Sequence, residues 1–178
     1  MRPIGRIIKK QSIHLTRVAV FIDAANLIYS QKTLGWKIDL ERFMKFFRAK
    51  YQVQRANYYY AYIKNDQAQQ KFFKKLEGFG YRIKTKEVKV IRQKDGTSFR
   101  KGNLDVDLTI DAVKSLDSYS KAIIVSGDSD FVSLVKYLQY RNRKVIIISA
   151  KGHIARELID CSDKYINLNS LKQEIEKK

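Results

Sequence analysis

From residue 17 onward, short apolar runs alternate with amphipathic segments. The apolar runs are rich in β-branched side chains, which is typical of strands covered on both faces of a parallel sheet. Between these runs, apolar residues recur at helical spacing, as in 40–50, where Phe43, Phe46 and Phe47 share one side and Asp39 is a suitable N-cap. The predicted strands are 18–22, 55–63, 81–84, 122–125, 145–148 and 165–168. The predicted helices are 40–50, 66–77, 103–116, 129–140, 154–160 and 170–178.

This alternation of strands and helices predicts a three-layer α/β/α sandwich with a mostly parallel central sheet. In such sheets, sites form at the carboxyl ends of the strands, where the strand order reverses. Asp23 directly follows the first predicted strand, and Asp128 comes soon after the strand 122–125. We therefore expect functional side chains at that edge of the sheet.

The segment 85–101 interrupts the alternation. Basic and apolar residues alternate there around an Asp95-Gly96 turn signal, which predicts either a β-hairpin or a basic loop. The chain as a whole then divides into three parts. These are a basic N-terminal extension over 1–16, an α/β domain over 17–169 and a charged C-terminal helix over 170–178.

Composition narrows the class of protein. At 178 residues, with 44% hydrophobic side chains, the chain is long enough for one domain with its own core. It has 36 Lys and Arg against 18 Asp and Glu, and the net charge of +18 predicts a polyanionic partner such as nucleic acid. One cysteine, Cys161, and two histidines, His14 and His153, argue against a Cys/His zinc site. Without an apolar run near the roughly 18–20 residues that span a bilayer, we expect a soluble, cytoplasmic protein, with a homo-oligomer left open.

Within this basic chain, aspartates gather where the site is expected. Asp23, Asp105, Asp128 and Asp130 follow predicted strands or begin predicted helices. Carboxylates that must approach a polyanion are most simply explained by a divalent cation between them. Mg²⁺ and Mn²⁺ prefer oxygen ligands, and in phosphoryl-transfer sites they activate water for attack on phosphorus.

Several of these acids have a simpler structural explanation. Asp128 is also a suitable N-cap for the helix predicted to begin near Ser129. Asp105 would be favoured near the positive end of its helix. For Asp23 this explanation is weaker, because a charge at the end of a buried strand needs partners.

Further polar residues accompany the four acids. Asp107 and Asp111 are four residues apart on one helical face, where like charges repel unless they bind something or face water. They are additional candidate acids. Asn26 and Asp130 are candidates for a second metal ligand or for positioning a water.

Three motifs around these residues resemble those of the NYN domain family, in its LabA-like branch of the PIN-like nuclease superfamily. The motifs are Phe21-Ile-Asp23-Ala-Ala-Asn26-Leu, Lys101-Gly-Asn-Leu-Asp105-Val-Asp-Leu-Thr-Ile-Asp111 and Val125-Ser-Gly-Asp128-Ser-Asp130-Phe. The resemblance covers about residues 17–168. It implies a PIN-like α/β/α sandwich that cleaves RNA with a divalent metal.

The resemblance also assigns roles to individual residues. It makes Asp23, Asp105, Asp128 and Asp130 the metal-binding acids and Asn26 the polar residue after the first strand. One extra residue separates the Lys-Gly pair from the acid of the second motif, at Asn103-Leu104. Either Asp105 or Asp107 can therefore be the acid that faces the metal.

The basic segment that precedes the second motif is the candidate nucleic-acid surface. Exposed Lys and Arg side chains neutralise phosphates, although a run of them can also be a solvated face. The tyrosines of 55–63 offer either stacking surfaces for unpaired bases or packing under helices, and Trp36 is expected to anchor a loop to the core. The basic residues predicted to contact nucleic acid are Lys86, Lys89, Arg92, Lys94, Arg100 and Lys101.

The sequence thus predicts a Mg²⁺- or Mn²⁺-dependent ribonuclease. The main alternative is a nucleic-acid-binding module with the same fold that lacks efficient cleavage, and the retained acids favour the enzyme. A nucleotide- or phosphate-binding regulatory domain is the third class, but the Gly-rich phosphate loops of P-loop and Rossmann proteins are missing from the sequence.

Overall fold

A parallel sheet forms the centre of the computed structural model, which describes residues 15–62, 64, 66–92, 98–101 and 103–178. Its six strands lie in the order β3-β2-β1-β6-β7-β8, and every neighbouring pair is parallel. This confirms the predicted fold class. The strands are β1 (Arg17–Asp23), β2 (Gln52–Tyr62), β3 (Arg82–Glu87), β6 (Lys121–Val125), β7 (Lys144–Ser149) and β8 (Lys164–Asn167).

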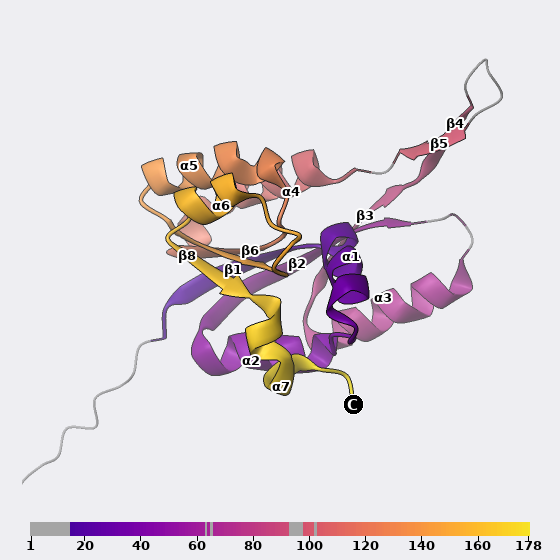
Figure 1. The fold of residues 1–178 in the computed structure, drawn as a ribbon, viewed down its shortest axis with the longest axis horizontal. Coiled ribbons are helices and arrows are strands. Elements are labelled where there is room, and N and C mark those ends of the chain that lie inside the picture. Colours follow the sequence, from indigo (N-terminus) through magenta and orange to yellow (C-terminus); the bar gives the residue numbers. More distant parts are fainter. Residues whose placement is uncertain (1–14, 63, 65, 93–97, 102) are drawn as a thin grey trace, which may run out of the picture.

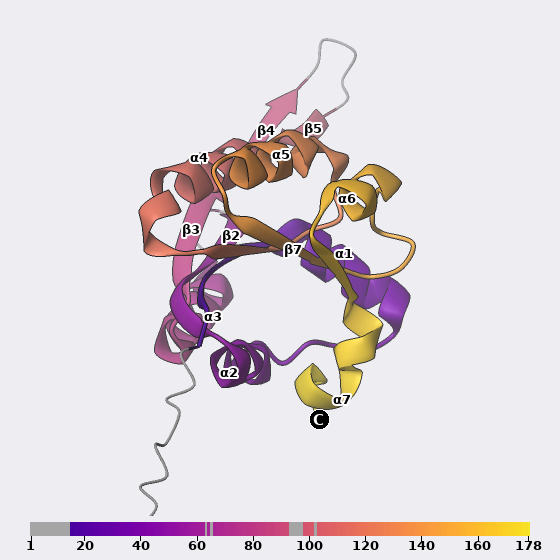
Figure 2. The ribbon, with the colours of Figure 1, turned by 90° about the vertical axis from the view of Figure 1, so that its left-hand side faces the viewer.

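Helices cover both faces of the sheet, as Figures 1 and 2 show. One helical layer contains α1 (Ala24–Leu34), α2 (Leu40–Lys50), α3 (Gln67–Phe79) and α7 (Lys172–Ile175). The opposite layer contains α4 (Asp105–Lys114), α5 (Val132–Tyr140) and α6 (Arg156–Cys161). The arrangement is the three-layer sandwich that the alternating pattern predicted.

Strand β1 explains why a continuous apolar run is needed at the centre of such a sheet. Val20 and Ile22 pack into the α2 layer, and Ala19 and Phe21 pack into the α4 and α5 layer. All four side chains are fully buried, so neither face of the strand tolerates a polar residue.

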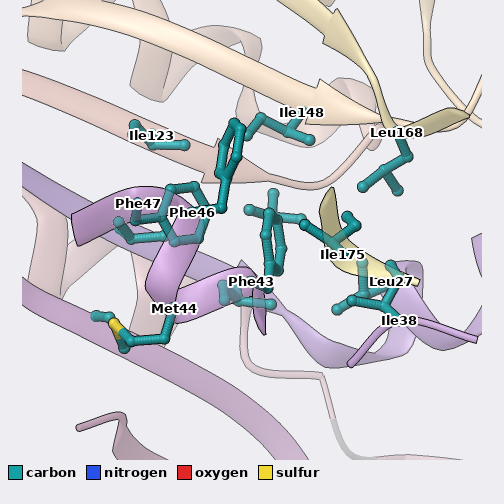
Figure 3. Packing of buried hydrophobic residues seen from close by; sticks show 14 of the residues in the cluster. Leu27, Ile38, Phe43, Met44, Phe46, Phe47, Ile123, Ile148, Leu168 and Ile175 are labelled. Atoms are coloured by element: carbon teal, nitrogen blue, oxygen red, sulfur yellow. The ribbon is translucent and has the colours of Figure 1, made fainter. Parts of the chain in front are cut away.

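Helix α2 supplies the aromatic part of the core. Its N-cap Asp39 accepts hydrogen bonds from the backbone N–H groups of Glu41 and Arg42, as the sequence predicted. Figure 3 shows the aromatic side chains of this helix pointing toward the sheet. Close ring contacts join Phe43, Phe46 and Phe47.

Helix α1 was not predicted, and it connects the end of β1 to the site described below. Asp23 caps it by accepting from the N–H of Asn26, and Gly35 ends it with a left-handed φ of 72°. Its sequence is only weakly amphipathic, which is why periodicity alone did not reveal it. The following Trp36 is buried and donates to Asn169 Oδ1 at 3.3 Å, in agreement with the predicted loop anchor.

Other boundaries differ from the predictions by small shifts. The predicted helices 103–116 and 129–140 each divide into an α-helix and a 3₁₀ turn, at Leu116–Ser118 and Ser129–Phe131. The charged C-terminal helix is shorter than predicted, because a 3₁₀ turn at Leu168–Leu171 precedes α7. Such differences are expected where helix ends tighten into 3₁₀ geometry.

The basic segment forms a hairpin outside the main sheet. Strands β4 (Lys89–Arg92) and β5 (Ser98–Lys101) pair antiparallel with each other and project away from the sandwich (Figures 1 and 2). The Asp95-Gly96 turn lies outside the described residues, as do residues 1–14 of the predicted extension. In the part of the chain that the structure describes, no helix has the length and apolar character needed to cross a membrane.

Candidate metal centre

The site forms where the order of the strands in the sheet reverses. From β1 the chain proceeds through β2 to β3 at one edge, and then returns to β6, β7 and β8 on the other side of β1. Strands β1 and β6 are direct neighbours, with Ile22 opposite Val125. Their carboxyl ends therefore place Asp23 beside the segment that follows β6, which is where α/β sheets bind ligands.

A cavity of about 380 Å³ opens at this edge. Asp23 and Asn26 come from the junction of β1 and α1, Asp105 begins α4, and Asp128 follows β6. The structure thus gathers residues from all three sequence motifs around one cavity. Tyr29 and His153 also line it.

Three carboxylates in this region lie close together. Asp105, Asp128 and Asp130 each offer an oxygen, and these oxygens all lie within 4.8 Å of one another. Burial raises the pKa of Asp105, a hydrogen bond with Asn103 opposes this shift, and repulsion from the neighbouring aspartates adds to it. Hard oxygen donors at such spacing are the chemistry that Mg²⁺ and Mn²⁺ prefer.

Asp23 lies in the same cavity but is held differently. Its Oδ1 accepts from the N–H of Asn26 at 3.1 Å, and its Oδ2 accepts from Ser126 Oγ at 2.9 Å. Burial raises the pKa of Asp23, and these hydrogen bonds counteract the shift. Among the described residues, Asp23 is not part of the three-carboxylate cluster, so its role as a metal ligand stays a prediction.

The segment after β6 is fixed to β1 and α1 by hydrogen bonds. Asn26 Oδ1 accepts from the N–H of Gly127 at 3.1 Å, and Ser126 Oγ accepts from the N–H of Asp128 at 3.3 Å. Asp128 Oδ1 in turn accepts from the N–H of Asp130 at 3.0 Å, so Asp128 caps its 3₁₀ turn while lining the cavity. The predicted capping role of Asp128 is therefore present, its role as a metal ligand stays a prediction, and Asn26 positions the loop.

Gly127 allows the loop before α6 to approach the site. A Cβ atom at this position would collide with the carbonyl oxygen of His153. The carbonyl of Gly127 accepts from the N–H of Ala155 at 2.9 Å, and Ser149 Oγ donates to the His153 carbonyl at 3.1 Å. A side chain at residue 127 would push away the loop that carries His153 into the cavity wall.

The three acids of α4 point to two different places. Asp105 joins the cluster, whereas Asp107 pairs with Lys86 at 3.2 Å on the exposed surface. Asp111 pairs with Lys84 at 3.2 Å, and its Oδ2 accepts from Tyr59 Oη at 3.0 Å and from Asn57 Nδ2 at 3.2 Å. Of the two candidate acids, Asp105 lines the cavity and Asp107 does not, so the geometry favours Asp105 as the predicted metal ligand of α4.

The residues predicted to contact nucleic acid lie in two places, on β3 and on the hairpin. Lys86 already has Asp107 as a partner. Lys89, Arg92, Arg100 and Lys101 belong to the strands of the hairpin, and Lys94 lies outside the described residues.

The tyrosines of β2 favour the packing interpretation. Tyr58 and Tyr59 are buried in opposite halves of the core, and Tyr60 packs against Phe72 and Phe73. Tyr62 is half-buried at the end of the strand. Base stacking by Tyr58 or Tyr59 would require opening the core, so these two side chains are structural.

Two residues of the cavity wall were missed as site residues by sequence reasoning. The rings of Tyr29 and His153 meet edge to face with centres 5.5 Å apart, and His153 Nε2 is hydrogen-bonded to Thr33 Oγ1. Tyr29 follows Asn26 by three residues, which places both on one face of α1. The missed helix concealed this signal.

Comparisons with known proteins identify the family of this chain. A family model for the NYN domain matches residues 17–169. The Low amplitude and bright protein LabA of Synechococcus elongatus is 33% identical over 165 residues, which cover 91% of this chain and 89% of that protein. A crystal structure of a protein of unknown function from Vibrio parahaemolyticus superimposes with a TM-score of 0.75 and 30% identity, covering 89% of this chain and 96% of the other. With the motifs gathered at one cavity of a parallel α/β/α sandwich, this chain belongs to the NYN domain family, in its LabA-like branch, and has the PIN-like nuclease fold.

Proposed function

We propose that this protein is a metal-dependent ribonuclease that hydrolyses phosphodiester bonds of RNA internally. The observation that carries the proposal is the cluster of Asp105, Asp128 and Asp130 beside a cavity at the reversal point of the sheet. The net charge of +18 favours a polyanionic partner, and clustered carboxylates would repel such a partner unless a cation lay between them. The NYN family assignment supports a nuclease-type function in general.

The donor set fits a hard divalent cation. All three clustered side chains are carboxylates, which are the ligands that such a cation prefers. Burial and repulsion between the aspartates disfavour the negative charge of Asp105, and a bound cation would offset both. Asp105, Asp128 and Asp130 would hold Mg²⁺ or Mn²⁺, with Asp23 completing the site. Such an ion, when bound, supplies positive charge to a phosphate and increases the acidity of water.

The other residues of the site provide position. Asp23 is immobilised by Asn26 and Ser126, so its carboxylate can accept a hydrogen bond from a water at a fixed place. Asn26 ties the segment after β6 to α1, which fixes Asp128 relative to Asp23. This preorganisation is what a reaction that depends on placing a water in line with a phosphate requires.

The basic hairpin would hold the nucleic acid next to this centre. It is connected directly to α4, whose first residue is Asp105, and its strands carry Lys89, Arg92, Arg100 and Lys101. Phosphate contacts of this kind position a nucleic acid without reading its sequence. Binding and cleavage would therefore depend on different parts of the molecule.

The proposal is tested with labelled RNA and DNA of the same sequence, each incubated with Mn²⁺, Mg²⁺ or EDTA. The expected result is internal cleavage of RNA with either metal and none with EDTA. Asp128→Asn, purified in parallel, should be inactive, and Asp107→Asn, whose carboxylate faces Lys86, serves as the matched control. Binding without cleavage under every metal condition would instead support the non-catalytic nucleic-acid-binding module. Cleavage that persists in EDTA or in Asp128→Asn would refute the assigned centre.

A further inference from the structure

Tyr29 combines two properties that no role described above explains. It lines the cavity that contains Asp23, Asp105 and Asp128, yet 63% of its surface is exposed. The cavity wall combines carboxylates with apolar side chains, and covering the exposed area of the Tyr29 ring with a ligand group would be favourable. Its exposure therefore indicates a surface for an aromatic or apolar group of a ligand.

The ring is held in place by neighbours rather than by burial. His153 meets it edge to face, with ring centres 5.5 Å apart, and Thr33 fixes the imidazole through a hydrogen bond to Nε2. The backbone carbonyl of His153 is in turn held by Ser149 Oγ at 3.1 Å. The loop that approaches Gly127 thus supports the side of the Tyr29 ring.

A basic side chain accompanies the ring. Lys32 Nζ lies over the face of the Tyr29 ring, 5.5 Å from its centre, in a cation–π contact. Lys32 is exposed, so a base that stacks on this face would displace its ammonium group, which could then contact the neighbouring phosphate. On the cavity side, Asn26 lies one helical turn before Tyr29, next to the acids. A phosphate at the carboxylate cluster and a base on Tyr29 would therefore belong to neighbouring positions of one strand.

We infer that Tyr29 is a specificity-determining residue that stacks on the base of a nucleotide next to the scissile phosphate, and that His153 positions its ring. This inference rests on the proposed nuclease function and adds the conformation of the substrate. A base can stack on Tyr29 only when it is unpaired and turned out of a helix. The site should therefore select unpaired nucleotides at the point of cleavage.

The inference is tested by binding in EDTA, where cleavage is excluded by the metal requirement. Fluorescent single-stranded RNA is titrated with wild type, Tyr29→Leu and Tyr29→Phe, with Tyr140→Leu as a control for loss of an exposed tyrosine on α5 outside the cavity lining. Tyr29→Leu should weaken binding by about tenfold, because a stacked base contributes roughly 1–3 kcal/mol. Tyr29→Phe should bind as wild type does, since stacking needs the ring and not the hydroxyl. Equal affinity of Tyr29→Leu and wild type would overturn the inference.

A spectroscopic arm separates stacking from a general loss of contact. RNA that contains one 2-aminopurine should show quenched fluorescence with wild type and Tyr29→Phe, and recovery of the signal with Tyr29→Leu. His153→Ala should give partial recovery of the fluorescence, because the Tyr29 ring would lose its neighbour. An unchanged signal in His153→Ala would show that His153 does not position the ring.

If wild type binds through Tyr29 but does not cleave with Mn²⁺, the ribonuclease proposal fails alone. If it cleaves with Mn²⁺ while Tyr29→Leu retains full affinity and quenching, only the stacking inference fails.

Discussion

Helix α4 presents its acids to two regions of the molecule that differ in the partners they offer. On the β3 side, Asp107 meets Lys86 and Asp111 meets Lys84, each at 3.2 Å. On the cavity side, Asp105 meets the carboxylates of Asp128 and Asp130. Among the side chains that the structure describes, no lysine or arginine is ion-paired with these three acids.

The difference shows how a single helix can serve both the fold and the site. Asp111 accepts hydrogen bonds from Tyr59 and Asn57, so its negative charge helps to attach α4 to β2 and β3. Burial and repulsion act against the charge of Asp105, which raises its pKa. The proposed cation would relieve this repulsion at Asp105, whereas it would have no such effect at Asp107 and Asp111, which already have lysine partners.

The largest effect is expected for cleavage. Asp128→Asn should reduce the rate of RNA cleavage in Mn²⁺ by at least about a hundredfold, because metal charge at a phosphate contributes several kcal/mol. Asp107→Asn should stay within about threefold of wild type, since an exposed ion pair contributes little. Both variants should keep their affinity for RNA in EDTA. Equal losses in the two variants would remove the distinction between the two regions.

The next effect concerns the basic hairpin. Replacing Lys89, Arg92 and Arg100 by Glu should weaken binding of single-stranded RNA and flatten its salt dependence by roughly two units of log affinity per log salt, because three phosphate contacts are lost at about 0.7 each. Lys86 is left unchanged, since Asp107 already pairs with it. Affinity is measured by fluorescence anisotropy over a salt series, with circular dichroism to verify folding. A folded variant with the wild-type slope would place the binding surface elsewhere.

The sequence predicted the parts of this protein that depend on local pattern. The apolar run before Asp23 and the cap at Asp39 each follow from burial and hydrogen bonding near in sequence, and both were found where expected. Spacing on α4 could not show which acid faces the cavity, because Lys84 and Lys86 approach from β3 and no pattern within the helix reveals them. Such pairings depend on the sheet order.

The same reasoning explains the missed cavity residues. Helix α1 is too weakly amphipathic to be recognised, so the placement of Tyr29 beside Asn26 was hidden. His153 reaches the cavity only because Gly127 permits a close backbone approach from another loop. That contact lies between segments far apart in sequence, and only the structure reveals it.

The melting temperature tests the role of the acids on the β3 side of α4. Asp111→Ala should lower the melting temperature by about 3–10 °C, because the Tyr59 hydroxyl loses its acceptor and the buried Asn57 loses one of its two, at a cost of roughly 1–3 kcal/mol. The measurement is differential scanning calorimetry without metal. Ser133→Ala, at an exposed position on α5, is a control for surface truncation. An unchanged melting temperature for Asp111→Ala would show that this attachment of α4 is dispensable.

A smaller effect of opposite sign is expected at Asp105. The pKa of Asp105 in the folded protein lies above its ordinary value of 3.8, so the folded state binds this proton more tightly than the unfolded state. Ionisation therefore removes stability as the pH rises through the folded pKa. Without metal at pH 7, Asp105→Asn should melt higher than wild type by on the order of 2 °C, since solvent screens a partly exposed carboxylate.

This increase should shrink as the pH falls through the raised pKa of Asp105, because wild-type Asp105 is then protonated as well. Addition of Mn²⁺ should reverse the order, because only wild type retains the full set of ligands. A variant that melts below wild type at pH 7 in EDTA would show that ionised Asp105 stabilises the fold without a metal, as Asp111 does.

The most direct test of the metal centre is Mn²⁺ binding followed by electron paramagnetic resonance, because it needs neither substrate nor cleavage. Wild type and Asp107→Asn should bind Mn²⁺ with the same affinity, with free-ion signal lost as the protein is added. A protein that carries both Asp105→Asn and Asp128→Asn should leave that signal unchanged over the same concentrations. Mn²⁺ binding by the double variant as tight as that of wild type would contradict the assignment of the centre to these carboxylates.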